Sequence, residues 1–282
     1  MKIFHTTKEL RSELSWLKNE GSTIGFIPTM GALHKGHISL IGKSKKETSF
    51  TVCSIFVNPT QFNNPNDLKK YPRTLDKDIE LLEEIKCDIL FVPSEKEVYP
   101  EPDTRQFDFG TLGKVMEGSF RPGHFNGVAQ VVSRFFSIIN PHKAYFGEKD
   151  FQQLVIIREL VKSEKINVQI IGCPTVREQD GLAMSSRNSL LSPLQRQNAP
   201  LISQTLFKAA GLSKNGFSVN SVSNWVENQI NSSDYLKVEY FQIVNEDGLI
   251  PVSGWNEGTG IIGCIAVYAG DVRLIDNVRF NL

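Results

Sequence analysis

Two histidines, His34 and His37, lie three residues apart at a place where the chain could bind a phosphate group. The segment Ile24–Ile41 reads as a buried strand, a tight turn at Gly31 and a helix that begins near Lys35–Gly36. The N-terminus of a helix offers unpaired N–H groups and the positive end of its dipole, and both suit a phosphate. The alternative is a pair of surface histidines. A zinc site is disfavoured because no third ligand follows at a recognisable spacing.

Two stretches imitate nucleotide-binding motifs without their context. Gly258–Gly263 has the spacing GxGxxG, but a strand pattern follows it, whereas a dinucleotide site requires a helix there. Gly36–Ser44 resembles a phosphate-binding P-loop, but five residues separate its glycines where that motif has four. We therefore assign neither stretch to a ligand.

Short apolar runs alternate with amphipathic helical stretches up to about Pro174. Apolar residues in Gly127–Ile139 and Asp150–Lys162 recur with helical spacing, and Asp150 is the expected N-cap. Nearly continuous apolar strands indicate a parallel sheet covered on both faces, so we predict a Rossmann-like, doubly wound α/β domain. The histidine turn would lie at its first β–α crossing, where such sheets bind ligands. The expected strands are Thr23–Pro28, Phe50–Val57, Asp88–Val92, Ala144–Phe146 and Val168–Cys173.

The pattern changes after Pro174. A polar stretch, Arg177–Pro193, leads to two helical segments near Leu194–Leu212 and Val219–Asn231, and strand-like runs follow. Helices followed by strands predict a smaller C-terminal α+β domain, with a boundary near residue 175. Its expected strands are Leu236–Val244, Gly260–Val267 and Val272–Ile275.

Charge and composition exclude several classes of protein. The chain carries 31 basic and 31 acidic side chains, and this neutral balance disfavours a nonspecific grip on nucleic acid. Met1–Leu10 lacks the apolar core of a secretory signal, and Gly260–Tyr268 is too short to cross a membrane. The four cysteines lie far apart in apolar runs, which indicates buried free thiols in a reducing compartment. We expect a cytoplasmic protein with no membrane or nucleic-acid partner.

The string PTMGALHKGH, Pro28–His37, resembles the HxGH element of the adenylyl-transferring Rossmann superfamily. Within that superfamily, nearly the whole chain resembles the pantoate–β-alanine ligase family. Gln130 is a departure, because a small residue such as Thr is commoner there, and it could alter the fit of a substrate pocket. The other matching blocks, in family order, are Phe56–Phe62, Tyr71–Asp76, Glu117–Val128, Phe146–Gln153, Pro174–Asn188 and Arg273–Asn277.

The resemblance implies an ATP-dependent ligase that works in two steps. The carboxylate of pantoate attacks the α-phosphate of ATP, which gives pantoyl adenylate and pyrophosphate. The amine of β-alanine then attacks the acyl carbon, which gives pantothenate and AMP. Because the pantoate carboxylate is already ionised at neutral pH, the first step requires positioning and charge stabilisation and no protein base.

The resemblance also implies an arrangement of domains and partners. Domain 1–175 would bind ATP and pantoate, domain 176–282 would act as a lid, and the enzyme would be a homodimer. Mg²⁺ would be held mainly by the triphosphate and water, with no ligand set supplied by the protein. Asp76 and Asp78 are candidates for support around that ion.

Individual roles follow from the same resemblance. His34 and His37 would contact the triphosphate, with His37 as the family's assigned proton donor. Lys149 would place a point charge on the phosphates, and Met184–Arg187 resembles the mobile KMSKS-type loop, whose hydroxyls and guanidinium wrap phosphates. The implied catalytic residues are His37, His34, Lys149, Ser185, Ser186 and Arg187. The implied ATP-binding residues are Met30, Gly31, Ala32, Leu33, His34, Lys35, Gly36, His37, Gly147, Glu148, Lys149, Asp150, Val176, Met184, Ser185, Ser186 and Arg187.

Gln61 and Gln153 resemble the family's pantoate ligands, with Asn58 as a weaker candidate. Neutral amides can bond hydroxyls and a carboxylate without adding charge beside the reacting anion. Without the resemblance, both glutamines would read as surface residues, Glu148–Asp150 as a charged loop and Ser185–Arg187 as an exposed polar turn. Arg121, with Pro122 and His124, belongs either to a closing loop or to a simple turn, and we leave it outside the catalytic set.

Three other functions would fit parts of the sequence. A nucleotidyltransferase that makes a dinucleotide would need a basic pocket for a second phosphorylated substrate, which two glutamines do not supply. A class I synthetase fragment would need a surface for tRNA, which the neutral charge balance does not support. An ATP-binding sensor without chemistry would have lost His34, His37, Lys149 or the serine loop, and all are present.

Overall fold

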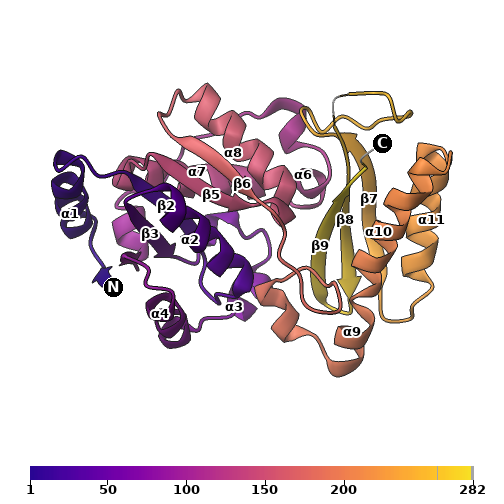
Figure 1. The fold of residues 1–282 in the computed structure, drawn as a ribbon, viewed down its shortest axis with the longest axis horizontal. Helices are drawn as coiled ribbons and strands as arrows, with labels where there is room; N and C mark the ends of the chain where they lie inside the picture. Colours follow the sequence, from indigo (N-terminus) through magenta and orange to yellow (C-terminus); the bar gives the residue numbers. More distant parts are fainter. Residues whose placement is uncertain (259, 281–282) are drawn as a thin grey trace. The chain divides into compact units, whose positions relative to one another are not determined.

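The computed structural model describes residues 1–258 and 260–280 of the chain (Figure 1). These residues form two compact units. Unit 1 consists of Met1–Gly113, Gly118–Glu148 and Gln153–Pro174, and unit 2 consists of Lys114–Glu117, Lys149–Gln152 and the chain from Thr175 on. Two short segments therefore pack in unit 2 although unit 1 surrounds them in the sequence, which the sequence did not indicate. The roles expected for domains 1–175 and 176–282 stay predictions.

Unit 1 is built on a six-stranded sheet with the strand order β1-β4-β3-β2-β5-β6, and all its pairings are parallel. The prediction of a Rossmann-like, doubly wound sheet is confirmed. Because β2 and β3 pair in register from Ile24↔Phe50 to Thr29↔Ile55, their carboxyl ends lie at the same edge. The strands are β1 (Lys2–Phe4), β2 (Ile24–Thr29), β3 (Phe50–Ile55), β4 (Ile89–Phe91), β5 (Lys143–Gly147) and β6 (Gln169–Cys173).

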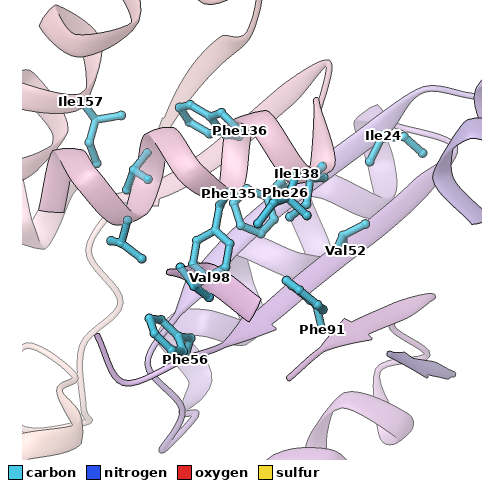
Figure 2. Packing of buried hydrophobic residues seen from close by; sticks show 14 of the residues in the cluster. Ile24, Phe26, Val52, Phe56, Phe91, Val98, Phe135, Phe136, Ile138 and Ile157 are labelled. Atoms are coloured by element: carbon cyan, nitrogen blue, oxygen red, sulfur yellow. The ribbon is translucent and has the colours of Figure 1, made fainter. Parts of the chain in front are cut away.

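Helices cover both faces of this sheet. Successive strand residues point to opposite sides, so neighbouring residues of one strand pack in different core clusters. Phe26 and Phe91 pack with Phe135, whose ring centroid lies 5.7 Å from that of Phe26, in the first core cluster (Figure 2). Their strand neighbours Ile27 and Leu90 belong to a second cluster. The first cluster includes residues of α1, α7 and α8, and the second includes residues of α2 and α4. The helices before Thr175 are α1 (Thr7–Asn19), α2 (Lys35–Glu47), α3 (Pro65–Lys70), α4 (Leu75–Glu84), α5 (Glu95–Val98), α6 (Glu117–Phe120), α7 (His124–Ile139) and α8 (Phe151–Ser163).

Unit 2 contains a three-stranded antiparallel sheet in the order β7-β8-β9, so the predicted α+β part is confirmed. Its core cluster joins apolar residues of these strands to α10 and α11, among them Leu206, Val226 and Ile265. Gly263 lies inside β8, so the GxGxxG string is no dinucleotide turn, and Thr259 of that string lies outside the described residues. The elements are α9 (Pro193–Asn198), α10 (Leu201–Lys214), α11 (Val219–Asn231), β7 (Lys237–Asn245), β8 (Ile261–Ala269) and β9 (Val272–Arg279).

Two sequence expectations were wrong. The histidine turn is at the second β–α crossing, because β1 and α1 precede it. The helix expected over Leu194–Leu212 is two helices, and Pro200, which has no N–H to donate, stands between them. Asp150, the expected N-cap, is the residue directly before α8 and the last residue of a 3₁₀ turn, Glu148–Asp150, that leads into this helix.

Candidate active site

A tight loop, residues 30–33, connects β2 to α2 at the carboxyl edge of the sheet. Gly31 has a φ of +83° and Ala32 a φ of +49°, both in the left-handed region that favours glycine. A Cβ atom on Gly31 would lie 3.1 Å from both Asp78 Oδ2 and Ile55 Cγ2. The turn at Gly31, expected from the sequence, therefore requires glycine both for its positive φ and because a Cβ atom would crowd Asp78 and Ile55.

The buried carboxylate of Asp78, on α4, holds this loop in place. Its Oδ2 accepts the N–H of Ala32 at 2.9 Å and its Oδ1 accepts the N–H of Leu33 at 2.7 Å. The hydroxyl of Thr74 donates to Oδ1 at 3.3 Å. Sequence reasoning considered Asp78 only beside a metal ion. In the structure both of its oxygens are bonded to protein donors, and the carboxylate acts as a positioning group for the loop.

His34 and His37 cap the N-terminus of α2 reciprocally. His34 Nδ1 accepts the N–H of Gly36 at 3.1 Å, and His37 Nδ1 accepts the N–H of His34 at 3.3 Å. A ring nitrogen that accepts a hydrogen bond carries no proton, so each neutral ring carries its proton on Nε2. Gly36 makes the arrangement possible, because a Cβ there would lie 2.8 Å from Cε1 of His34. The ring centroids are 4.1 Å apart, so the pair presents two Nε2–H groups from one small area.

Gln61 lies at the end of a 3₁₀ turn, Pro59–Gln61, that follows β3. Its side chain is buried; its Nε2 lies 3.2 Å from Met30 Sδ, and its Oε1 accepts from Asn58 Nδ2 at 3.1 Å. Helix α7 fixes this turn from the other side, because His124 Nδ1 lies 2.8 Å from the carbonyl of Gln61. Gly127 permits the close approach, since a Cβ there would overlap the backbone of the turn.

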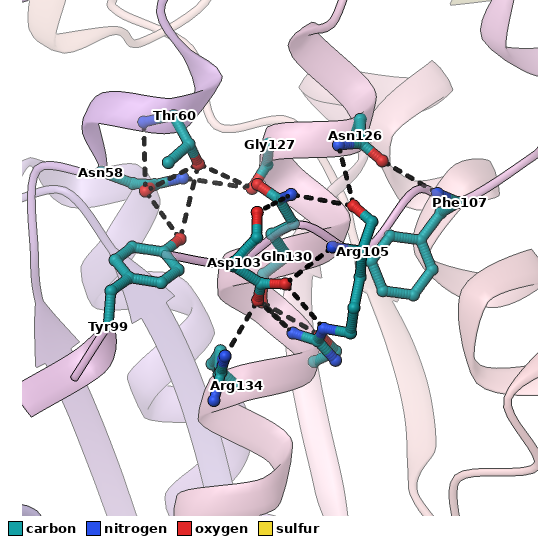
Figure 3. Close-up of polar contacts among 11 residues, drawn as sticks. Asn58, Thr60, Tyr99, Asp103, Arg105, Phe107, Asn126, Gly127, Gln130 and Arg134 are labelled. Carbon is teal, nitrogen blue, oxygen red and sulfur yellow. Dashed lines mark hydrogen bonds and ion pairs between the residues drawn. The ribbon is translucent and has the colours of Figure 1, made fainter. Parts of the chain in front are cut away.

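Asn58 is part of the scaffold around Gln61, and Figure 3 shows its bonds to Thr60, Tyr99 and Gly127. Its Nδ2 donates to Gln61 Oε1 and to the carbonyl of Gly127, at 3.1 and 3.2 Å. Its Oδ1 accepts from the hydroxyls of Tyr99 and Thr60, at 2.9 and 3.1 Å. Both N–H groups of the Asn58 amide donate within the protein, and one of these bonds orients the Gln61 side chain. The sequence did not indicate this contact.

Gln130, the departure from the family pattern, is also a scaffold residue (Figure 3). Its Nε2 donates to the carbonyls of Asp103 and Arg105, each at 2.9 Å. Residues 103–107 form a strap that is also held by Asp103, whose carboxylate pairs with Arg105 and Arg134. The hydrogen bond from Arg105 holds the pKa of the Asp103 carboxyl well below its usual range. The Gln130 side chain thus secures the strap of residues 103–107 to α7.

Unit 2 holds the other group of expected residues. Lys149 stands in the 3₁₀ turn Glu148–Asp150; its side chain is 16% exposed and its Nζ lies 3.7 Å from Asp150 Oδ2. Residues 176–184 form a short hairpin in which the N–H of Met184 donates to the carbonyl of Val176 at 3.0 Å. Ser185 caps the following 3₁₀ turn, Ser186–Leu190, by accepting the N–H of Arg187 at 3.3 Å.

The expected site residues therefore fall into two described groups. In unit 1 are residues 30–37, Gly147, Glu148, Asn58, Gln61 and Gln153, and the bond between Gln61 and Met30 joins two of these stretches. In unit 2 are Lys149, Asp150, Val176 and residues 184–187. Within residues 1–258 and 260–280, no cluster of three or more His, Cys, Asp or Glu side chains could hold a metal ion.

The model of the family described as pantoate-beta-alanine ligase matches residues 2–279. The chain belongs to this family of ligases. A relative named pantothenate synthetase, from Bacteroides fragilis strain YCH46, is 55% identical over 281 residues, which are 100% of this chain and 99% of that protein. The crystal structure of the pantothenate synthetase from Thermus thermophilus has a TM-score of 0.94 and 41% identity, and the match covers 100% of both chains.

A second solved member of the pantoate–β-alanine ligase family comes from Francisella tularensis. It has a TM-score of 0.83 and 39% identity, and the match covers 99% of this chain and 98% of that one. That enzyme was crystallised in complex with beta-gamma ATP and beta-alanine. The identification confirms the family resemblance drawn from the sequence motifs.

Two further observations concern this ligase as a whole. All four cysteines are free and buried, as expected from the sequence. Burial raises the pKa of the Cys87 and Cys173 thiols to about 11, and it raises those of Cys53 and Cys264 as well, so these groups are protonated at neutral pH.

In the part of the chain that the structure describes, no helix has the length and apolarity to span a membrane.

The role of Asp78 leads to a prediction with a matched control. In Asp78→Asn, an NH₂ group must replace one oxygen that now accepts a backbone N–H, so we expect the free energy of unfolding to fall by about 2 kcal/mol. We also expect the KM for ATP to rise, because residues 30–33 lose their support. Glu80→Gln, at an exposed position of the same helix, should change neither quantity. Urea unfolding and steady-state kinetics measure both; equal behaviour of the two variants would contradict the role of Asp78.

Proposed function

We propose that this chain condenses pantoate with β-alanine to form pantothenate, through a pantoyl-adenylate intermediate, and releases AMP and pyrophosphate. The observation that carries the proposal is the reciprocal cap of α2, in which His34 and His37 accept backbone N–H groups with Nδ1 and keep their protons on Nε2. Two such N–H donors at a helix N-terminus suit the oxygens of a triphosphate. The ATP complex of the Francisella tularensis enzyme supports ATP as the co-substrate.

The first chemical step needs an oriented carboxylate and a stabilised phosphate. In our proposal the pantoate carboxylate attacks the α-phosphorus, the bond from this atom to the bridging oxygen breaks, and pyrophosphate leaves with the electron pair. Imidazole N–H groups of His34 and His37 and the ammonium of Lys149 stabilise the charge that builds up on the phosphate oxygens. Proton transfer by His37 would be a separate step, and this mechanism does not require it.

The remaining proposed contacts bring the substrates together. Gln61 and Gln153 bind pantoate through neutral amides, and Asn58 supports Gln61 by its hydrogen bond. Residues 184–187 close on the β- and γ-phosphates, and Asp150 binds the ribose. Mg²⁺ fits this scheme as an ion carried by the triphosphate, since it usually keeps several waters and binds substrate phosphates. The proposal also includes a homodimer that works in the cytoplasm.

The second step is aminolysis of the adenylate. The neutral amine of β-alanine attacks the acyl carbon to give a tetrahedral intermediate. The bond from this carbon to the phosphate oxygen then breaks, AMP leaves with the electron pair, and the nitrogen releases its extra proton to solvent. Beta-alanine in the Francisella tularensis complex supports this choice of amine. A bound acyl adenylate also explains why a ligase would need a closing loop, because water must be kept from this intermediate.

Isotope exchange between ATP and pyrophosphate tests the proposed function directly. With pantoate and Mg²⁺ present, we expect exchange without β-alanine, because adenylate formation is reversible and precedes amine attack. Exchange with nicotinamide mononucleotide and none with pantoate would indicate a nucleotidyltransferase and would overturn the proposal. A panel of other carboxylic acids then defines the acid that the site accepts.

Substitution of Gln153 tests the pantoate site separately from the ATP site. In Gln153→Ala, the loss of a hydrogen bond to substrate should raise the KM for pantoate by about tenfold and leave that for ATP within about twofold. Gln169→Ala, at an exposed position of β6, provides the control. Equal losses for both substrates would place Gln153 outside the pantoate site.

A further inference from the structure

Three polar residues of unit 2 form a continuous chain of bonds that ends on the backbone of Lys149. Arg177 donates to Asp276 through both Nη atoms, at 2.6 and 2.9 Å. Asp276 Oδ1 accepts the N–H of Asn277 at 2.8 Å. Asn277 Nδ2 then donates to the carbonyl of Lys149 at 3.0 Å. Asp276 and Asn277 are both buried, so their bonds are protected from competition by water.

The same three residues are tied to the hairpin that precedes residues 184–187. Arg177 lies in this hairpin, opposite Ala183, and its Nη1 also donates to the carbonyl of Gly181 at 3.2 Å. The N–H of Glu178 donates to the carbonyl of Leu182 at 2.8 Å, which closes the hairpin around Arg177. Its guanidinium carbon lies 4.8 Å from the ring centroid of Phe207, so packing restricts it further.

One strand, β9, therefore fixes two stretches of chain that are distant in sequence. Asp276 holds the hairpin through Arg177, and the next residue, Asn277, holds the turn that carries Lys149. The guanidinium of Arg279 lies 5.6 Å from the ring centroid of Phe151, which adds a second contact between β9 and this segment. The hairpin and the backbone of Lys149 are therefore bonded to adjacent residues of one strand.

We propose that Arg177, Asp276 and Asn277 form one positioning group that keeps the Lys149 ammonium in register with residues 184–187 on the same triphosphate. The inference rests on the proposed function, because it takes Lys149 and residues 184–187 as phosphate-binding groups. None of the three needs to touch the substrate. Their contribution is the placement of a charge, and a displacement of about 1 Å at a catalytic group can cost a factor of about 10² in rate.

A double-mutant cycle tests whether Asn277 acts through Lys149. In the full-length enzyme, Asn277→Ala should lower the kcat of pantoate-dependent ATP–pyrophosphate exchange by about 10- to 100-fold, with the KM for pantoate within about twofold. In the Lys149→Ala background, the same substitution should cost less than about threefold, because the ammonium it positions is gone. Asn215→Ala removes an exposed bond of the same type, from Nδ2 to the carbonyl of Gly211 at 3.0 Å, and should leave kcat unchanged.

The outcomes separate this inference from the proposed function. A large loss in Lys149→Ala combined with full multiplication of the two effects would overturn the positioning role and leave the role of Lys149 intact. A loss below threefold in Lys149→Ala itself would overturn both the positioning role of Asn277 and the role of Lys149. If Asn277→Ala lacks a cooperative unfolding transition, Asn277→Leu repeats the cycle, because it keeps the branched shape of the side chain and removes the N–H donor to Lys149 without adding a charge.

Discussion

Replacement of Lys149 by alanine should lower kcat/KM by about 10²- to 10³-fold, the size of effect found when one donor to a developing charge is removed. Lys149 stands in the turn directly after β5, its side chain is mostly shielded from solvent, and its backbone is held by Asn277. A shielded ammonium interacts more strongly with phosphate oxygens than an exposed one, because less water screens its charge. Its Nζ lies 3.7 Å from Oδ2 of Asp150, a carboxylate that is 45% exposed, so solvent weakens this ion pair.

The control for this prediction is another lysine that loses the same charge. Lys162, on α8, is 80% exposed and pairs with Glu159 at 3.5 Å, so Lys162→Ala should leave kcat/KM within about twofold. Lys149→Arg keeps the charge but spreads it over a planar group, and we expect it to recover only part of the rate. Steady-state kinetics with saturating ATP and varied pantoate measure all three variants. A decrease of less than threefold in Lys149→Ala would remove this residue from the mechanism.

The sheet could be predicted from the sequence because most of its strands carry a distinctive pattern. Runs such as Phe50–Ile55 are buried on both faces, and this produces the continuous apolar pattern from which a parallel sheet was predicted. The three-residue β1 is too short to show any period, and α1 was overlooked although Leu10, Leu14 and Leu17 follow a helical spacing into the core. Short strands take their identity from the partner, here β4, and not from their own residues.

The site was predictable where a motif encodes local geometry and not where distant residues support it. His34, Gly36 and His37 form a cap within four residues, and the pattern of strand, turn and helix in Ile24–Ile41 predicts the N-terminus of that helix. Asp78 bonds Ala32 and Leu33 across more than forty positions of sequence, and no pattern in a single chain reveals such a bond. The same holds for Asn277 and Lys149, which are 128 positions apart.

A buried ionic cluster supports our second large prediction. Arg273 of β9 donates to both oxygens of Glu117, each at 2.7 Å, and to Glu239 of β7 at 2.5 and 2.9 Å. Tyr240 adds a bond from its hydroxyl to Glu117 Oε1 at 2.7 Å. The three charged side chains are only 10% to 16% exposed. Through Glu117 this cluster attaches the segment Lys114–Glu117 to the sheet of unit 2.

Arg273→Met should lower the free energy of unfolding by about 3 to 5 kcal/mol, because it leaves two shielded carboxylates facing each other without their common partner. Arg196→Met is the control: this arginine pairs with Asp180 at 2.5 Å, but the two side chains are 37% and 38% exposed, and its loss should cost less than about 1 kcal/mol. Urea unfolding at neutral pH measures both. Similar small losses in the two variants would mean that the cluster contributes nothing beyond a surface ion pair.

The origin of this loss can be tested by removing the remaining charges. If repulsion and desolvation of the two carboxylates cause it, Glu117→Gln and Glu239→Gln added to Arg273→Met should restore a large part of the stability, although they remove still more of the native contacts. If the cluster acts instead through packing of the arginine stem, the added glutamines should lower stability further.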